Sequence, residues 1–134
     1  AFADIEAMQA VAAGGKREIR LTLADGVVHA VPCLKGVDLQ GIIGLAMVPS
    51  FDRRLVGSGK IPFGKHQLTV SGIYLQTTHK TAPFGSMINT VEKNGIIELW
   101  FKGDEISGKL DLHWCDINLD AGLALIRSRS PQME

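Results

Sequence analysis

The chain has few cysteines and few aromatic residues. Only two cysteines, Cys33 and Cys115, occur among 134 residues, and aromatic residues make up 6% of the chain. This excludes a disulfide-rich mini-protein and gives little support to single-stranded nucleic-acid binding, which depends on aromatic stacking. Basic and acidic residues balance to a net charge of zero, which further argues against nucleic acid as a partner. The apolar neighbours of Cys33 favour free thiols over a bridge between the two cysteines.

Long hydrophobic runs are also absent. The most apolar stretch, residues 42–48, is far shorter than the roughly 20 residues that a transmembrane helix needs. We therefore expect no transmembrane segment. Because the chain begins at Ala1 rather than at methionine, we expect it to be processed, truncated or excised from a longer polypeptide.

Motifs that would indicate catalysis, a metal or a nucleotide are missing as well. The four histidines lack metal-site spacing, and the Gly57–Lys60 segment does not fit a phosphate-binding loop. An enzyme that uses His113 with Asp111 or Cys115 stays an alternative, although nothing in the sequence places these residues together. We predict a non-catalytic protein without a cofactor or a metal.

Alternation of apolar and polar residues is the pattern that the chain does have. Asp25-Gly26 and Asn94-Gly95 are typical of tight hairpin turns between such segments. Between 66 and 76 the alternation changes parity at Ser71-Gly72, which indicates a β-bulge. The predicted strands lie near 17–23, 27–33, 66–76, 87–92, 96–102, 106–114 and 123–128.

Two segments suggest helices. Residues 4–13 fit a short N-terminal helix, with Asp4 as the N-cap and Ile5, Met8 and Val11 on one face. Residues 38–48 fit a second short helix that ends before Pro49, and residues 42–48 fit a buried strand nearly as well. Together the patterns predict one mainly β domain over 1–134, an antiparallel β-barrel or β-sandwich of about seven strands.

The strand over 96–102 is apolar on both faces. Ile97, Leu99 and Phe101 face one side, while Ile96 and Trp100 face the other. The helix over 4–13, a second subunit or an enclosed ligand would cover the second face. The leading prediction is a structural or interaction module that forms a homo-oligomer, or binds a protein partner, through sheet faces or edges.

A small-ligand carrier is the alternative. In it an apolar or amphipathic ligand occupies the barrel, and basic residues of a segment free of acidic residues bind its anionic group. The candidate ligand-binding residues are Tyr74, Trp100, Phe101 and Trp114 inside the barrel, with Arg53, Arg54, Lys60 and Lys65 as donors to an anion.

Overall fold

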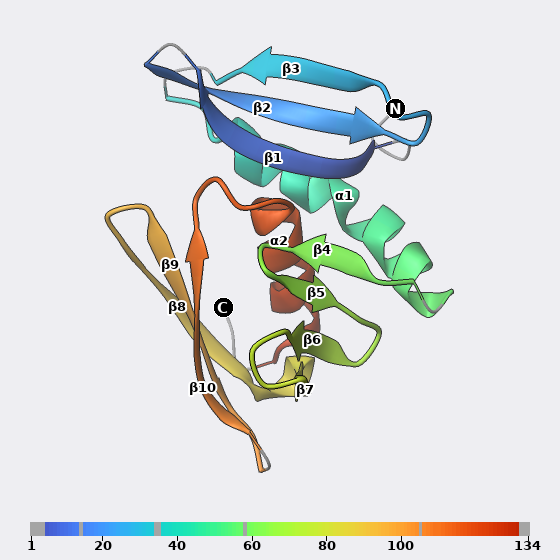
Figure 1. Ribbon diagram of the computed structural model, residues 1–134, viewed down its shortest axis with the longest axis vertical. Helices are drawn as coiled ribbons and strands as arrows, with labels where there is room; N and C mark the ends of the chain where they lie inside the picture. Colours follow the sequence, from blue (N-terminus) through green and yellow to red (C-terminus); the bar gives the residue numbers. More distant parts are fainter. Residues whose placement is uncertain (1–4, 14, 34–35, 58, 105, 132–134) are drawn as a thin grey trace.

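The computed structural model describes residues 5–13, 15–33, 36–57, 59–104 and 106–131 (Figure 1). They form three antiparallel sheets and two α-helices, which confirms the mainly β class. The sheets are separate from one another, so the predicted barrel or sandwich is not confirmed. The elements are β1 (Ile5–Ala13), β2 (Lys16–Leu23), β3 (Val28–Pro32), α1 (Leu39–Val56), β4 (Ile61–Phe63), β5 (His66–Leu68), β6 (Gly72–Leu75), β7 (Lys80–Pro83), the short 3-10 helix η2 (Phe84–Ser86), β8 (Met87–Lys93), β9 (Ile96–Lys102), β10 (Ser107–His113) and α2 (Leu119–Arg129).

Helix α2 lies at the centre of the molecule, with sheet β8–β10 on one side and sheet β4–β7 on the other (Figure 1). Helix α1 and the sheet β1–β3 cover its N-terminal end. Most of α2 is buried, including Leu119, Leu125 and Ile126. The predicted strand over 123–128 is therefore wrong. A short, almost entirely apolar run has no clear periodicity, so a buried helix and a buried strand look alike in sequence.

The predicted helix over 4–13 is also wrong: residues 5–13 form β1, and the proposed N-cap Asp4 lies outside the described residues. A β-bulge shifts the register between Ile5 and Ala7. The bulge turns both Ile5 and Met8 toward the core, which a regular strand would not do for residues three apart. The i, i+3 spacing of a helix therefore arises here from a bulged strand.

Helix α1 confirms the helical alternative for 38–48, but it continues past Pro49 to Val56. Pro49 is exposed, so the N–H that proline lacks is missing at the surface of the helix and not in the core. Gly44 has a packing role rather than a breaking one. A Cβ at this position would lie 2.8 Å from the backbone carbon of Asp120, so the two helices meet here without a side chain between them.

The C-terminal meander follows the sequence closely. The predicted strands 87–92, 96–102 and 106–114 are confirmed as β8, β9 and β10. Positive φ angles at Asn94 (51°) and Gly95 (79°) form the predicted tight turn. The predicted strand over 66–76 is instead two strands, β5 and β6, because a turn that closes from Thr69 N–H to Gly72 C=O (2.8 Å) replaces the expected bulge.

Asn118 joins three parts of the fold immediately before α2. Its Oδ1 accepts a hydrogen bond from Met8 N–H (3.0 Å), and its Nδ2 donates to Pro62 C=O (2.8 Å). These contacts connect β1, β4 and the start of α2, and they satisfy the polar atoms of a fully buried side chain. Cys33 and Cys115 are half-buried free thiols, as predicted. Within the described residues, neither helix has the combination of length and hydrophobicity needed to cross a bilayer.

Candidate functional site

Helix α1 carries the three most exposed large aliphatic side chains among the described residues. Ile42 is 57% exposed, Leu45 is 67% exposed and Val56 is 73% exposed, and Pro49 is exposed between them. Their spacing of three, four and seven residues places all four on one side of the helix. We call these residues, Ile42, Leu45, Pro49 and Val56, the open face of α1.

The open face carries almost no charge. Residues 39–51 contain no acidic or basic side chain. Asp38 precedes this side of the helix, and Asp52 and Arg53 follow Pro49 on it, with the Asp52 carboxylate paired to Arg129. The opposite side of α1 is buried against the rest of the protein and includes Met47, Phe51 and Leu55. The helix is therefore apolar on two sides, and only one of them is covered by described residues.

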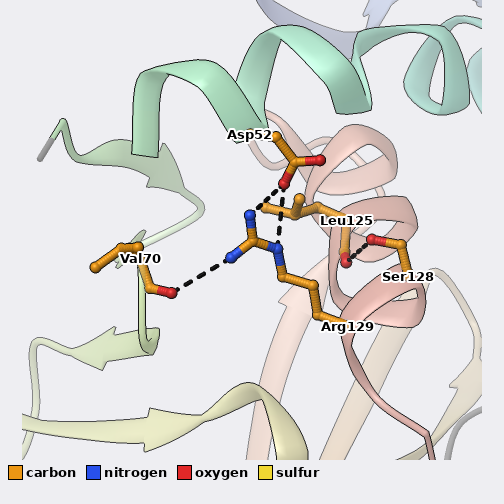
Figure 2. Close-up of polar contacts among 5 residues, drawn as sticks. All are labelled: Asp52, Val70, Leu125, Ser128 and Arg129. Carbon is orange, nitrogen blue, oxygen red and sulfur yellow. Dashed lines mark hydrogen bonds and ion pairs between the residues drawn. The ribbon is translucent and has the colours of Figure 1, made fainter. Parts of the chain in front are cut away.

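Polar contacts fix α1 at both of its ends. At the C-terminal end, Arg129 of α2 donates from Nε (3.1 Å) and from Nη2 to the Asp52 carboxylate, and from Nη1 to Val70 C=O (3.3 Å), as Figure 2 shows. At the N-terminal end, Gln40 Nε2 donates to Asp120 Oδ2 (3.1 Å). The open face is thus part of a well-anchored helix, so little ordering is needed before it binds.

The neighbouring Arg54 is held by the protein itself. Its Nη1 donates to Glu6 C=O (2.7 Å), and its guanidinium lies 5.4 Å from the centre of the Phe51 ring. Of the two arginines predicted to bind an anion, only Arg53 points freely to solvent among the described residues.

A second, smaller apolar surface lies on the outer face of the sheet β8–β10. Trp100 is 40% exposed and Ile96 is 38% exposed. The helix over 4–13 that was expected to cover them does not form, because residues 5–13 are strand β1 of another sheet. The indole is instead surrounded by charged neighbours: Lys109 Nζ lies 5.8 Å from the ring centre, and Trp100 Nε1 donates to Glu98 Oε1 (3.4 Å).

The charges around Trp100 stabilise one another. Lys109 Nζ donates to Glu98 Oε2 (2.7 Å), and this hydrogen bond lowers the pKa of Glu98 and raises the pKa of Lys109. Lys109 also lies 3.6 Å from the carboxylate of Asp111. Trp100 is therefore already partnered by a cation and a hydrogen-bond acceptor, unlike the side chains of the open face of α1.

The remaining predicted ligand-binding residues do not meet in one cavity. Lys60 Nζ lies 5.9 Å from the Tyr74 ring, whose hydroxyl is 2.9 Å from His79 Nδ1 at the surface. Lys65 is exposed on the turn between β4 and β5. Phe101 is buried in the core, and Trp114 lies beneath the Arg17 guanidinium at 4.1 Å. Their roles in ligand binding stay predictions.

The structure gives no catalytic arrangement around His113 among the described residues. The backbone N–H of His113 donates to Asp116 Oδ2 (2.9 Å), while no described hydrogen bond joins its ring to Asp111 or Cys115. The described part of the chain also contains no cluster of three or more histidine, cysteine or acidic residues that could hold a metal ion. The enzyme alternative therefore gains no geometric support.

His66 is the histidine with the most distinct environment. It is buried, and its Nδ1 accepts a hydrogen bond from Gln76 N–H (3.2 Å). Burial, and then the nearby charge of Lys65, lower its pKa, while Asp116 opposes the shift. His66 is thus a neutral structural residue at physiological pH.

Sequence reasoning missed the open face of α1. The uncharged run over 39–51 was its signal, but the boundary expected at Pro49 hid the continuation of the apolar stripe to Val56. No protein-family model, curated protein or solved structure matches the chain. The function is therefore inferred from the geometry of this chain.

Proposed function

We propose that the chain is a non-catalytic interaction module that forms a symmetric dimer, in which the open face of α1 packs against the same face of a second copy. The observation that carries the proposal is the exposure of Ile42, Leu45 and Val56 on one well-anchored, nearly uncharged helix face. Full burial of an aliphatic side chain of this size contributes about 1.5–3 kcal/mol. Both copies contribute the same residues to such an interface.

Charge favours an antiparallel arrangement of the two α1 helices. In a parallel pair, Arg53 of one copy would face Arg53 of the other, which is repulsive. In an antiparallel pair with its two-fold axis at Pro49, Ile42 faces Val56 and Arg53 faces Leu45. The two guanidinium-bearing positions are then about 12 Å apart along the helix axis, and the helix dipoles are opposed favourably.

A second copy fits this surface better than a strongly charged partner does. The two apolar ends of the open face are complementary under a two-fold rotation, because a rotation about Pro49 places Ile42 opposite Val56. Isologous interfaces require this kind of self-complementarity, and two-fold dimers are the commonest oligomers. The surface around Trp100 is smaller and carries charges that are already paired.

The test is the oligomeric state in solution. Analytical ultracentrifugation from micromolar to millimolar protein should show a monomer–dimer equilibrium. Leu45→Lys should weaken the dimer at least about 100-fold, because each new lysine enters the apolar surface and faces Arg53 of the other copy. Val28→Glu on the edge strand β3 and Trp100→Ala on the sheet face are the matched controls, and both should leave the dimer intact.

These controls separate the helix face from the sheet surfaces predicted from sequence. Loss of the dimer in Val28→Glu would assign it to a sheet edge, and loss in Trp100→Ala would assign it to a sheet face. A strict monomer at millimolar concentration would contradict self-association altogether.

Cysteine cross-linking tests the orientation of the two helices. In a Cys33→Ser, Cys115→Ser background, Ile42→Cys chains should cross-link with Val56→Cys chains and not with themselves. Cross-linking of Ile42→Cys chains to one another would instead show a parallel pair.

A further inference from the structure

A cavity of about 280 Å³ lies away from the open face of α1, where the start of α1, the helix α2 and the sheet β8–β10 meet. Its volume is near the lower end of the range found for small-molecule sites. Ile97, Leu119 and Leu123 supply buried apolar surface, whereas the charged lining residues are Arg17, Asp38, Glu92, Asp120 and Arg127. The cavity therefore has an apolar floor and charged walls.

One wall of the cavity is a single face of α2. Asp120, Leu123 and Arg127 follow one another at intervals of three and four residues, so they share this face. Two helical turns separate the carboxylate-bearing and the guanidinium-bearing positions by about 10 Å along the helix axis. The wall thus presents a negative end, an apolar middle and a positive end.

The negative end holds two carboxylates, and within the described residues neither forms an ion pair with a basic side chain. Asp120 accepts a hydrogen bond from Gln40 Nε2 (3.1 Å), and Asp38 also lines the cavity. Burial, and then the charge of Asp38, raise the pKa of Asp120, while Gln40 and Arg127 oppose the shift. A cationic group bound here would relieve the repulsion between the carboxylates.

The positive end has an arginine available for an anion. Arg127 Nη2 makes one long hydrogen bond, to Thr90 Oγ1 (3.4 Å), and no ion pair joins Arg127 to a carboxylate within the described part of the chain. Its remaining N–H groups suit a carboxylate.

Trp114 supplies a further wall. The Arg17 guanidinium lies 4.1 Å from the centre of its ring, and both residues line the cavity. The stacked guanidinium orients the indole, which then offers apolar surface between the two charged ends.

We propose that this cavity binds an ω-amino acid, a small zwitterion whose ammonium contacts Asp120, whose carboxylate contacts Arg127 and whose methylene spacer lies against Leu123. The two helical turns between the two positions favour an extended zwitterion over a compact one, in which one carbon joins the charged groups. This ligand differs from the apolar or amphipathic one predicted from sequence, and its binding is independent of the dimer.

Isothermal titration calorimetry with four probes tests the proposal: ε-aminocaproate, caproate, n-hexylamine and free glycine. ε-Aminocaproate should bind at least about tenfold more tightly than caproate or hexylamine, each of which lacks one charge. Free glycine, whose charges are adjacent, should bind no better than the singly charged probes. Comparable affinities for all four probes, or no binding of ε-aminocaproate at millimolar concentration, would overturn the proposal.

Variants assign the two ends. Arg127→Gln should weaken ε-aminocaproate about tenfold and leave hexylamine unchanged, whereas Asp120→Asn should weaken ε-aminocaproate and hexylamine and leave caproate unchanged. Arg20→Gln, on the outer face of β2, is the matched control and should change neither ligand. If Arg127→Gln and Arg20→Gln behave alike, the proposed carboxylate site is wrong.

The pH dependence gives an independent readout. As pH falls through the raised pKa of Asp120, its carboxylate becomes neutral, so hexylamine and ε-aminocaproate should bind more weakly. Asp120→Asn should remove this pH dependence of hexylamine binding, because the amide does not titrate while the ligand's ammonium keeps its charge. An unchanged pH dependence in Asp120→Asn would contradict the assignment.

Discussion

The open face of α1 and the outer face of the sheet β8–β10 both expose large apolar side chains, but their surroundings differ. On the sheet, Trp100 lies beside Lys109 and donates to Glu98. On the helix, Leu45 and Ile42 have no charged residue between positions 39 and 51. An exposed aromatic ring with a cation and an acceptor is stable in water, whereas a continuous aliphatic stripe is a surface that favours association.

The largest expected effect comes from the helix crossing that holds α1 in place. Gly44→Ala puts a Cβ 2.8 Å from the backbone carbon of Asp120, which cannot move away as a flexible side chain would. We expect a loss of about 1–3 kcal/mol in the free energy of unfolding, measured by chemical denaturation. Gly57→Ala, where a Cβ meets only contacts of 3.6 Å or longer, is the control.

Helix propensity alone predicts the opposite result for Gly44→Ala, a gain of about 1 kcal/mol. A stabilised variant would therefore show that α1 and α2 do not approach closely at this point. It would also mean that α2 does not hold α1 firmly in place at this crossing.

A smaller effect is expected at the clasp shown in Figure 2. Asp52→Asn removes the ion pair with Arg129, whose partners are both partly exposed to solvent. We expect a loss of about 0.5 kcal/mol in the free energy of unfolding, and less at high salt. Because the buried side of α1 remains packed, the dimer should persist in ultracentrifugation. Loss of the dimer without loss of stability would mean that Asp52 itself contributes to the interface.

The smallest effect is expected on the outer face of the sheet β8–β10, around Trp100. Lys109→Met removes the hydrogen bond that lowers the pKa of Glu98, so the Glu98 carboxyl should take up its proton at a higher pH. An NMR titration of that carboxyl carbon measures the change, with Lys80→Met, on a strand of another sheet, as the control. An unchanged pKa in Lys109→Met would show that Lys109 does not partner the Trp100 surface in solution.

The C-terminal meander could be predicted because its signals are local. The alternation of Ile97, Leu99 and Phe101, and the Asn94-Gly95 turn, depend only on neighbouring residues. The same method failed at β1, where the bulge after Ile5 changes the side-chain period. It also failed at α2, whose surroundings are apolar on several sides.

The candidate sites were harder to predict than the fold class. The open face of α1 has a local signal that Pro49 masked, since proline usually ends a helix. The cavity has no local signal at all. Arg17, Asp38, Trp114 and Arg127 come from separate parts of the chain, and only packing brings them together.

The sequence by itself determined the mainly β class and the β8–β10 meander, because these follow from residue spacing and composition. Only the tertiary structure decided that three separate sheets surround α2, that 5–13 is a bulged strand and which apolar side chains stay exposed. The physical reason is that burial depends on contacts between distant segments. The same side chain is core or surface according to what those segments cover.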